Sequence, residues 1–185
     1  KLYCYMFHSF YDFNKYFEKY RKDLLILKRD GIINNIGVSL YSNDELESVL
    51  KFNEITLVQL PFNLLDNNNK RGNIIKKAKA KGIEIHTRSA FLQGLFFLNP
   101  IGLSEFFSPV KGYLMALQDN FDNSQSVAAA LLNWVINKSF IDKVVIGVNT
   151  NAQFESNIKG LESSSKCKLP EWISVPNEIL MPNLW

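Results

Sequence analysis

"IGVSLYSNDELESVL", residues 36–50, reads as the end of a buried strand followed almost at once by the start of a helix. Its first four residues are apolar or small and end at Ser39. Ser42, with Glu45 three residues later, gives the pattern of a capping box, in which the two residues satisfy each other's free backbone N–H groups. The stretch therefore predicts one βα unit with a small polar residue, Ser39, at the end of its strand.

The same unit recurs along the chain. Short apolar runs bounded by Gly, Asn or Ser predict strands over residues 2–8, 33–39, 56–62, 83–89 and 143–148. Helical patterns occupy residues 12–31, 43–53, 72–82, 110–121, 124–139 and 151–162. The first four strands begin at intervals typical of βα units, so consecutive strands should be parallel with right-handed crossovers.

Alternating strands and helices leave two architectures: an open doubly wound sheet or a (β/α)8 barrel. No GxGxxG follows a predicted strand and no GxxxxGK[ST] is present, so the usual nucleotide-binding signatures of open sheets are missing. This absence favours a barrel. Residues 1–185 contain no Gly/Ser linker or low-complexity segment, and we expect one α/β domain.

Composition narrows the class of protein. A net charge of +3 over 185 residues is too small for the basic surface that nucleic acids or membranes attract. Cys4 and Cys167 are far apart and form no metal-binding pattern, so we expect no metal site and a reducing, cytoplasmic location. No apolar run suggests a membrane span or signal peptide. The chain begins inside a predicted strand without Met, so we expect part of a longer protein.

Polar residues at strand ends are the candidates for function, because ligands of parallel α/β folds bind at the carboxyl ends of strands. His8 is either a general acid or donor in a pocket, or an imidazole satisfied by the backbone. Gln59 lies in an apolar strand and needs a partner, on a neighbouring strand or on a ligand. Ser39 has the same choice, with its own backbone as a further option. Asn149 and Thr150 either cap a helix or help bind a phosphate.

Several ordered motifs resemble the aldo-keto reductase family. They are "IGVS" with its capped helix, "VQLPFNLLD", "KGIEIHTRSAFLQGL", "VAAALLNWVINKSFIDKVVIGVNTNAQFESNI", and a tail ending Pro-x-x-Trp. The resemblance covers nearly the whole chain and aligns it with the family's barrel from the fourth strand onward. It implies an incomplete (β/α)8 TIM barrel, strands four to eight with their helices, and NAD(P)H-dependent reduction of a carbonyl.

The resemblance assigns the strand-end residues. His8 is similar to the family's strand-four histidine, which orients the carbonyl. Ser39 and Gln59 are similar to the residues that hold the nicotinamide carboxamide, a group with one acceptor and two donor hydrogens that Ser and Gln can match. Leu40 stands where the family usually has Asn, and Arg88 where a tyrosine commonly stacks on the nicotinamide.

Two further segments are assigned by the resemblance alone. In the family, one loop lies along the pyrophosphate of the cofactor, and it corresponds here to Ser89, Phe91, Gln93 and Gly94. The family's adenosine-binding segment corresponds to Gly147, Asn149, Gln153 and Asn157. Asn149 occupies a position where some members carry an arginine for the 2′-phosphate, so both NADPH and NADH stay open as cofactors. The family's catalytic Asp, Tyr and Lys come from earlier strands that this sequence does not contain.

We therefore expect the carboxyl-terminal portion of an aldo-keto reductase acting on a small aldehyde, ketone or sugar, inactive alone and partnered by its amino-terminal half or a second chain. The alternative is a non-catalytic, nucleotide-binding or regulatory relative. Loss of the carboxamide-binding Asn and the stacking Tyr is the feature that motivates this alternative.

Overall fold

Five strands form one parallel sheet in the order β1-β2-β3-β4-β5 in the computed structural model, which describes residues 1–162 and 168–185. The strands are β1 (Leu2–Phe7), β2 (Ile33–Ser39), β3 (Leu57–Pro61), β4 (Glu84–Arg88) and β5 (Lys143–Val144). Each strand pairs in parallel with the next, which confirms the predicted α/β class and strand direction. Cys167 lies outside the described residues.

The chain divides into two compact units, a sheet unit and a helical unit. The sheet unit comprises Lys1–Pro61, Lys70–Arg88 and Ser139–Val144; the helical unit comprises Phe62–Asn69, Ser89–Lys138 and Val145–Trp185. The expectation of one domain over residues 1–185 stays a prediction.

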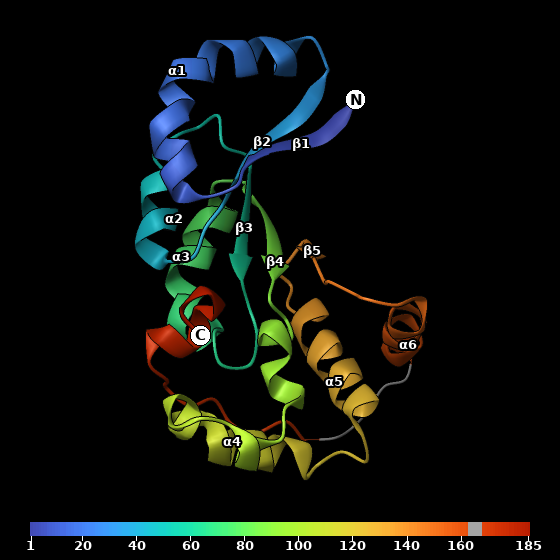
Figure 1. Ribbon diagram of the computed structural model, residues 1–185. Helices are drawn as coiled ribbons and strands as arrows, with labels where there is room; N and C mark the ends of the chain where they lie inside the picture. Colours follow the sequence, from blue (N-terminus) through green and yellow to red (C-terminus); the bar gives the residue numbers. More distant parts are fainter. Residues whose placement is uncertain (163–167) are drawn as a thin grey trace. The chain divides into compact units, whose positions relative to one another are not determined.

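The sheet unit carries helices α1 (Phe10–Arg29), α2 (Asn43–Val49) and α3 (Asn68–Ala80), which lie on the same side of the strands (Figure 1). The capping box of Ser42 and Glu45 is present as predicted. Gly31, with φ 71°, follows α1 in the left-handed conformation that favours glycine. Aromatic rings of Phe7, Phe13 and Phe17 pack between β1 and α1 with centroids 4.8–6.1 Å apart.

Three predicted element boundaries were wrong by four residues. Helix α2 ends at Val49 and not at residue 53, because Lys51 and Phe52 donate to carbonyls three residues back and so close the helix in tight turns. Helix α3 begins at Asn68 and not at residue 72, because the Asn67 side chain accepts from the Asn69 N–H and caps the helix earlier.

The third wrong boundary is the end of the last strand. Strand β5 stops at Val144 and not at residue 148. Its neighbour β4 ends at Arg88, which the register places level with residue 145, and Ser89 has φ 61°, so β4 offers no extended backbone for residues 146–148 to pair with. Val145 and Val148 are accordingly 44% and 40% exposed.

The helical unit contains α4 (Ser108–Gln118), α5 (Ser124–Ile136) and α6 (Asn151–Glu162). Among the described residues of this unit, five short 3-10 helices accompany them: η1 (Leu92–Phe97), η2 (Pro100–Gly102), η3 (Glu105–Phe107), η4 (Asn177–Leu180) and η5 (Pro182–Leu184). Phe96 is fully buried in the core of this unit, whereas Phe106 is largely exposed. Among the described residues, no helix combines the length and apolar character that crossing a membrane requires.

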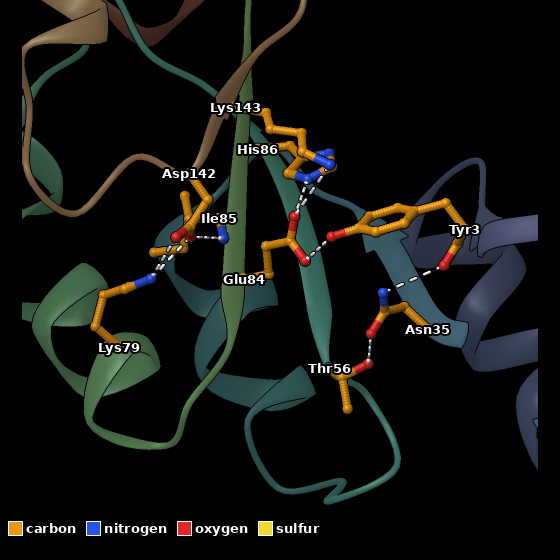
Figure 2. Close-up of polar contacts among 9 residues, drawn as sticks. All are labelled: Tyr3, Asn35, Thr56, Lys79, Glu84, Ile85, His86, Asp142 and Lys143. Atoms are coloured by element: carbon orange, nitrogen blue, oxygen red, sulfur yellow. Dashed lines mark hydrogen bonds and ion pairs between the residues drawn. The ribbon is translucent and has the colours of Figure 1, made fainter.

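One carboxylate joins three strands of the sheet unit near their amino ends (Figure 2). Glu84 accepts from the Tyr3 hydroxyl of β1, lies 2.7 Å from His86 Nε2, and lies 3.7 Å from Lys143 Nζ of β5. Asp142, next to Lys143, accepts from the Ile85 N–H at 2.7 Å and from Lys79 of α3. These contacts fix the two edges of the sheet to β4.

We expect the ionisation of Glu84 to make the stability of the fold depend on pH. Burial alone would raise the pKa of Glu84, but hydrogen bonds from Tyr3 and His86 outweigh burial and hold the pKa below its ordinary value. Stability from this carboxylate is therefore complete above the ordinary glutamate pKa and is lost as the pH falls through the lower pKa of the folded chain. We expect the free energy of unfolding, measured by urea unfolding at a series of pH values, to fall less steeply at acid pH (the acid limb of the curve) in Glu84→Gln than in the wild-type chain. The exposed Glu155→Gln is the control, and an unchanged limb in Glu84→Gln would contradict this role.

Gly37 is required by close packing inside the sheet. A Cβ at this position would lie 2.9 Å from Cys4 Sγ and 3.0 Å from the Leu57 carbonyl oxygen. We expect Gly37→Ala to lower the free energy of unfolding by about 1–3 kcal/mol, the usual effect of overpacking. Gly112→Ala is the matched control, because an added Cβ meets nothing within 4 Å there and alanine favours a helix. Equal stability of the two variants by urea unfolding would refute the packing argument.

Candidate functional site

Ser39 and Gln59 lie side by side at the carboxyl ends of β2 and β3. The two residues are register partners, and Ser39 Oγ donates to Gln59 Oε1 over 3.4 Å. This long hydrogen bond is weak, and both side chains are half-buried. Within residues 1–162 and 168–185, no protein group accepts from the Gln59 amide nitrogen. The pair thus offers a hydroxyl, an amide oxygen and unused amide N–H groups, the set that a planar carboxamide can match.

His8 lies in the same row of strand ends. It directly follows Phe7, whose register partner is Val38, so His8 stands one residue further along, level with Ser39. Its imidazole is exposed and helps line a cavity of about 450 Å³ together with Tyr5 and Tyr16. The register therefore places His8, Ser39 and Gln59 side by side at the carboxyl ends of three successive strands.

Arg88 and Leu40 make contacts within the protein. The Arg88 guanidinium carbon lies 4.1 Å from the centroid of the Tyr41 ring, and Nη2 donates to the Leu40 carbonyl over 3.3 Å. The Leu40 side chain is completely buried. Arg88 is therefore stacked on a tyrosine of its own chain, and Leu40 offers the site its carbonyl and no side-chain group.

The loop from Ser89 to Gly94 in the helical unit is held in an unusual conformation. Ser89, Leu92 and Gln93 have φ between 45° and 61°, a region that non-glycine residues rarely adopt and that costs of order 1–3 kcal/mol per residue. Gly94, with φ 86°, meets this geometry without strain, and its N–H donates to the Phe91 carbonyl. Such strain persists only where the surrounding structure enforces it.

Asn63 enforces the position of this loop. It is fully buried, its Nδ2 donates to the Ser89 carbonyl over 3.1 Å, and its Oδ1 accepts from the N–H groups of Leu65 and Asp66. The sequence shows Asn63 only as a polar residue after a strand. Its role as a positioning residue depends on which carbonyl the amide reaches, and no sequence pattern specifies that.

The segment around Asn149 caps helix α6. Thr150 Oγ1 accepts from the Gln153 N–H at 3.2 Å, and Gln153 Oε1 accepts from the Asn149 N–H at 2.8 Å. Helix capping, one of the two alternatives for Asn149 and Thr150, is therefore present. Asn157 is buried on α6, and Gly147 is exposed with open space around it. These residues belong to the helical unit, whereas Ser39 and Gln59 belong to the sheet unit.

Comparison with known proteins gives the family. A model of the aldo/keto reductase family matches residues 3–166. The chain belongs to the aldo/keto reductase family. No curated protein matches it by sequence.

Solved structures of this family share the fold. An aldo-keto reductase from Bacillus halodurans in its holo form is 17% identical with a TM-score of 0.65, over 97% of this chain and 58% of that one. A thermostable aldo-keto reductase in complex with the inhibitor epalrestat is 19% identical with a TM-score of 0.56, over 96% and 57%. An aldo/keto reductase from Brucella melitensis is 18% identical with a TM-score of 0.56, over 87% and 55%. The chain thus spans a little over half the length of these reductases.

Asn63 should be a major stabilising residue of this aldo/keto reductase chain. Asn63→Ala removes the side-chain acceptor of two backbone N–H groups, those of Leu65 and Asp66, and a buried N–H that loses its acceptor costs about 1–3 kcal/mol. It also removes one donor to the Ser89 carbonyl, which keeps its hydrogen bond from the Leu92 N–H. We expect a loss of at least that size in urea unfolding, with faster amide hydrogen exchange in residues 89–94. Asn14→Ala, at an exposed position in α1, is the control and should change stability by less than about 0.5 kcal/mol. If the amide hydrogens of residues 89–94 exchange in Asn63→Ala at the wild-type rate, Asn63 does not position this loop.

Proposed function

We propose that the chain is the cofactor-binding portion of an NAD(P)H-dependent oxidoreductase that reduces the carbonyl of a small aldehyde, ketone or sugar. The observation that carries the proposal is the register pairing of Ser39 with Gln59 at the carboxyl ends of adjacent parallel strands. Membership of the aldo/keto reductase family supports the class of reaction. The five parallel strands are then strands four to eight of a (β/α)8 barrel.

The donor set fits a nicotinamide carboxamide. The Gln59 amide can donate to the carboxamide oxygen while Ser39 Oγ and Gln59 Oε1 accept from its NH2 group. Bound NADPH or NADH would supply a hydride to the carbonyl carbon. His8, level with this pair, would hold the carbonyl oxygen by a hydrogen bond and so orient the substrate. In the helical unit, the loop from Ser89 to Gly94 and the residues Gly147, Asn149, Gln153 and Asn157 are assigned to the rest of the cofactor by family resemblance.

We infer that the proton donor of the reduction comes from outside this chain. Among the tyrosines of β1, Tyr3 donates its hydroxyl proton to Glu84, and this hydrogen bond, together with burial, raises its pKa. Tyr3 is thus a poor acid near neutral pH. Loss of a general acid typically slows a reaction by about 100- to 10,000-fold, so we infer that this chain is inactive alone.

The open edge of β1 supports a requirement for a partner. Strand β1 is at the end of the strand order, and Leu2, Tyr3 and Tyr5 are 57%, 47% and 44% exposed. Unpaired backbone and exposed apolar side chains on an edge strand favour pairing with another strand. We propose that the preceding half of a reductase barrel covers this edge; a second copy of this chain is the alternative occupant.

A non-catalytic, nucleotide-binding relative is the second candidate function. The buried Leu40 side chain leaves the site without the amide that the family usually has there, and Arg88 is stacked on Tyr41. Both features weaken the grip on the nicotinamide end and leave the assigned adenosine segment unaffected.

Isothermal titration calorimetry with NADPH and NADH tests cofactor binding by the chain as it exists. We expect saturable binding of at least one of them, weakened by up to about tenfold in Ser39→Ala, since one hydrogen bond contributes about 0.5–1.5 kcal/mol. Ser48→Ala, whose hydroxyl bonds to the Asp44 carbonyl on the exposed face of α2, is the matched control. No binding by a chain shown to be folded by circular dichroism would refute both candidate functions.

Turnover of a small aldehyde separates the two candidates. If the chain binds cofactor and an amino-terminal reductase segment restores turnover that His8→Ala then reduces, the reductase is supported. If binding occurs and the same addition restores no turnover, the non-catalytic reading is favoured.

A further inference from the structure

The helical unit contains a cavity of about 240 Å³ that none of the residues assigned to the cofactor lines. Its walls come from Asn67–Asn69 at the start of α3, from Trp134 in α5, from Lys138 just after α5, and from Trp172 in the carboxyl-terminal segment. Cavities that bind drug-sized ligands are usually about 300–1,000 Å³. This cavity is therefore of a size for a small molecule with about one ring.

Two indole rings form fixed walls. Trp134 stacks on Phe62 with centroids 5.5 Å apart and the planes inclined by 19°. The Trp172 indole N–H donates to the Leu65 carbonyl over 3.0 Å. Because both rings are held by contacts within the same unit, a planar ligand ring would meet aromatic surfaces that need no rearrangement.

A positive charge without an acidic partner lies against one of these walls. Lys138 Nζ is 4.0 Å from the centroid of the Trp134 ring. In the part of the chain that the structure describes, no carboxylate lies within ion-pair distance of this ammonium group. Burial lowers the pKa of Lys138, so its charged form has lost hydration that no protein anion replaces. An anionic group in the cavity would restore that stabilisation.

The asparagines supply polar contacts of two kinds. Asn67 is committed to the protein, because its Nδ2 donates to the Leu64 carbonyl and its Oδ1 accepts from the Asn69 N–H. Asn68 and Asn69 are exposed, and among the described residues their side-chain amides have no protein partner. Amides of this kind can donate to the second oxygen of an anion held by a single lysine.

We propose that this cavity binds a small organic carboxylate that carries one planar ring. The carboxylate lies on Lys138 Nζ, and the ring packs against Trp134 and Trp172. One lysine matches a single negative charge, and two indole rings in the cavity lining match an apolar ring. The assignment is independent of the proposed reductase function, because it involves none of the residues given to the cofactor.

Benzoate is the probe, and indole N–H resonances of the full chain are the readout. The chain has three tryptophans, of which Trp185 donates to the Glu178 carbonyl and does not line the cavity. We expect benzoate to shift the Trp134 and Trp172 signals saturably and to leave the Trp185 signal in place. Benzamide, which lacks the charge, acetate, which lacks the ring, and inorganic phosphate should each bind at least about tenfold more weakly. No saturable shift with benzoate, or equal binding of benzamide, would overturn the proposal.

Lys138→Met tests the charge while keeping the length of the side chain. We expect benzoate to bind about tenfold more weakly or worse, with the benzamide affinity unchanged. Lys159→Met, at an exposed position on α6, is the matched control and should bind benzoate as the wild-type chain does. Wild-type benzoate affinity in Lys138→Met overturns the assignment. NADPH and NADH are titrated into the same samples in a separate experiment. Loss of benzoate binding and loss of cofactor binding can therefore be told apart, and only the second bears on the reductase proposal.

Discussion

The absence of a side chain at residue 37 is the constraint on which the sheet unit depends. Strand β2 lies between β1 and β3, and at Gly37 both neighbours approach so closely that a Cβ would meet Cys4 Sγ at 2.9 Å and the Leu57 carbonyl oxygen at 3.0 Å. Two residues further along, the same register pairs Ser39 with Gln59. The candidate site therefore inherits its geometry from a packing contact in the middle of the sheet, since displacing β2 there would also separate the two polar side chains.

The sequence predicted well those parts of the fold that depend on local pattern. The capping box of Ser42 and Glu45 involves residues close together in the chain, and its hydrogen bonds form as the pattern requires. The end of β5 could not be predicted in this way, because residues 145–148 are as apolar as those of a strand. What they lack is a partner, and that follows from the turn of the neighbouring backbone at Ser89.

The same distinction applies to the candidate site. Ser39 and Gln59 could be selected from the sequence because a polar residue at the end of a buried parallel strand is costly without a partner. Stacking of Arg88 on Tyr41, 4.1 Å away, joins residues 47 positions apart (88 − 41), and the complete burial of the Leu40 side chain is likewise a tertiary property. Asn63 was equally beyond prediction as a positioning residue, because its importance lies in the Ser89 carbonyl that its amide reaches.

The two ends of the strands differ in how far their polar groups are satisfied, and this difference indicates where a ligand belongs. Near the amino ends, the Glu84 carboxylate has donors from Tyr3 and His86 and a nearby ammonium group from Lys143, so both of its oxygens have partners within the protein. At the carboxyl ends, Ser39 and Gln59 share one weak hydrogen bond, and the Gln59 amide N–H groups have no acceptor among the described residues. A polar side chain that is half-buried and only partly bonded is stabilised further by a ligand that completes its hydrogen bonds. On this physical ground we propose that a ligand binds at the carboxyl ends of the strands, the end at which parallel α/β barrels bind their ligands in general.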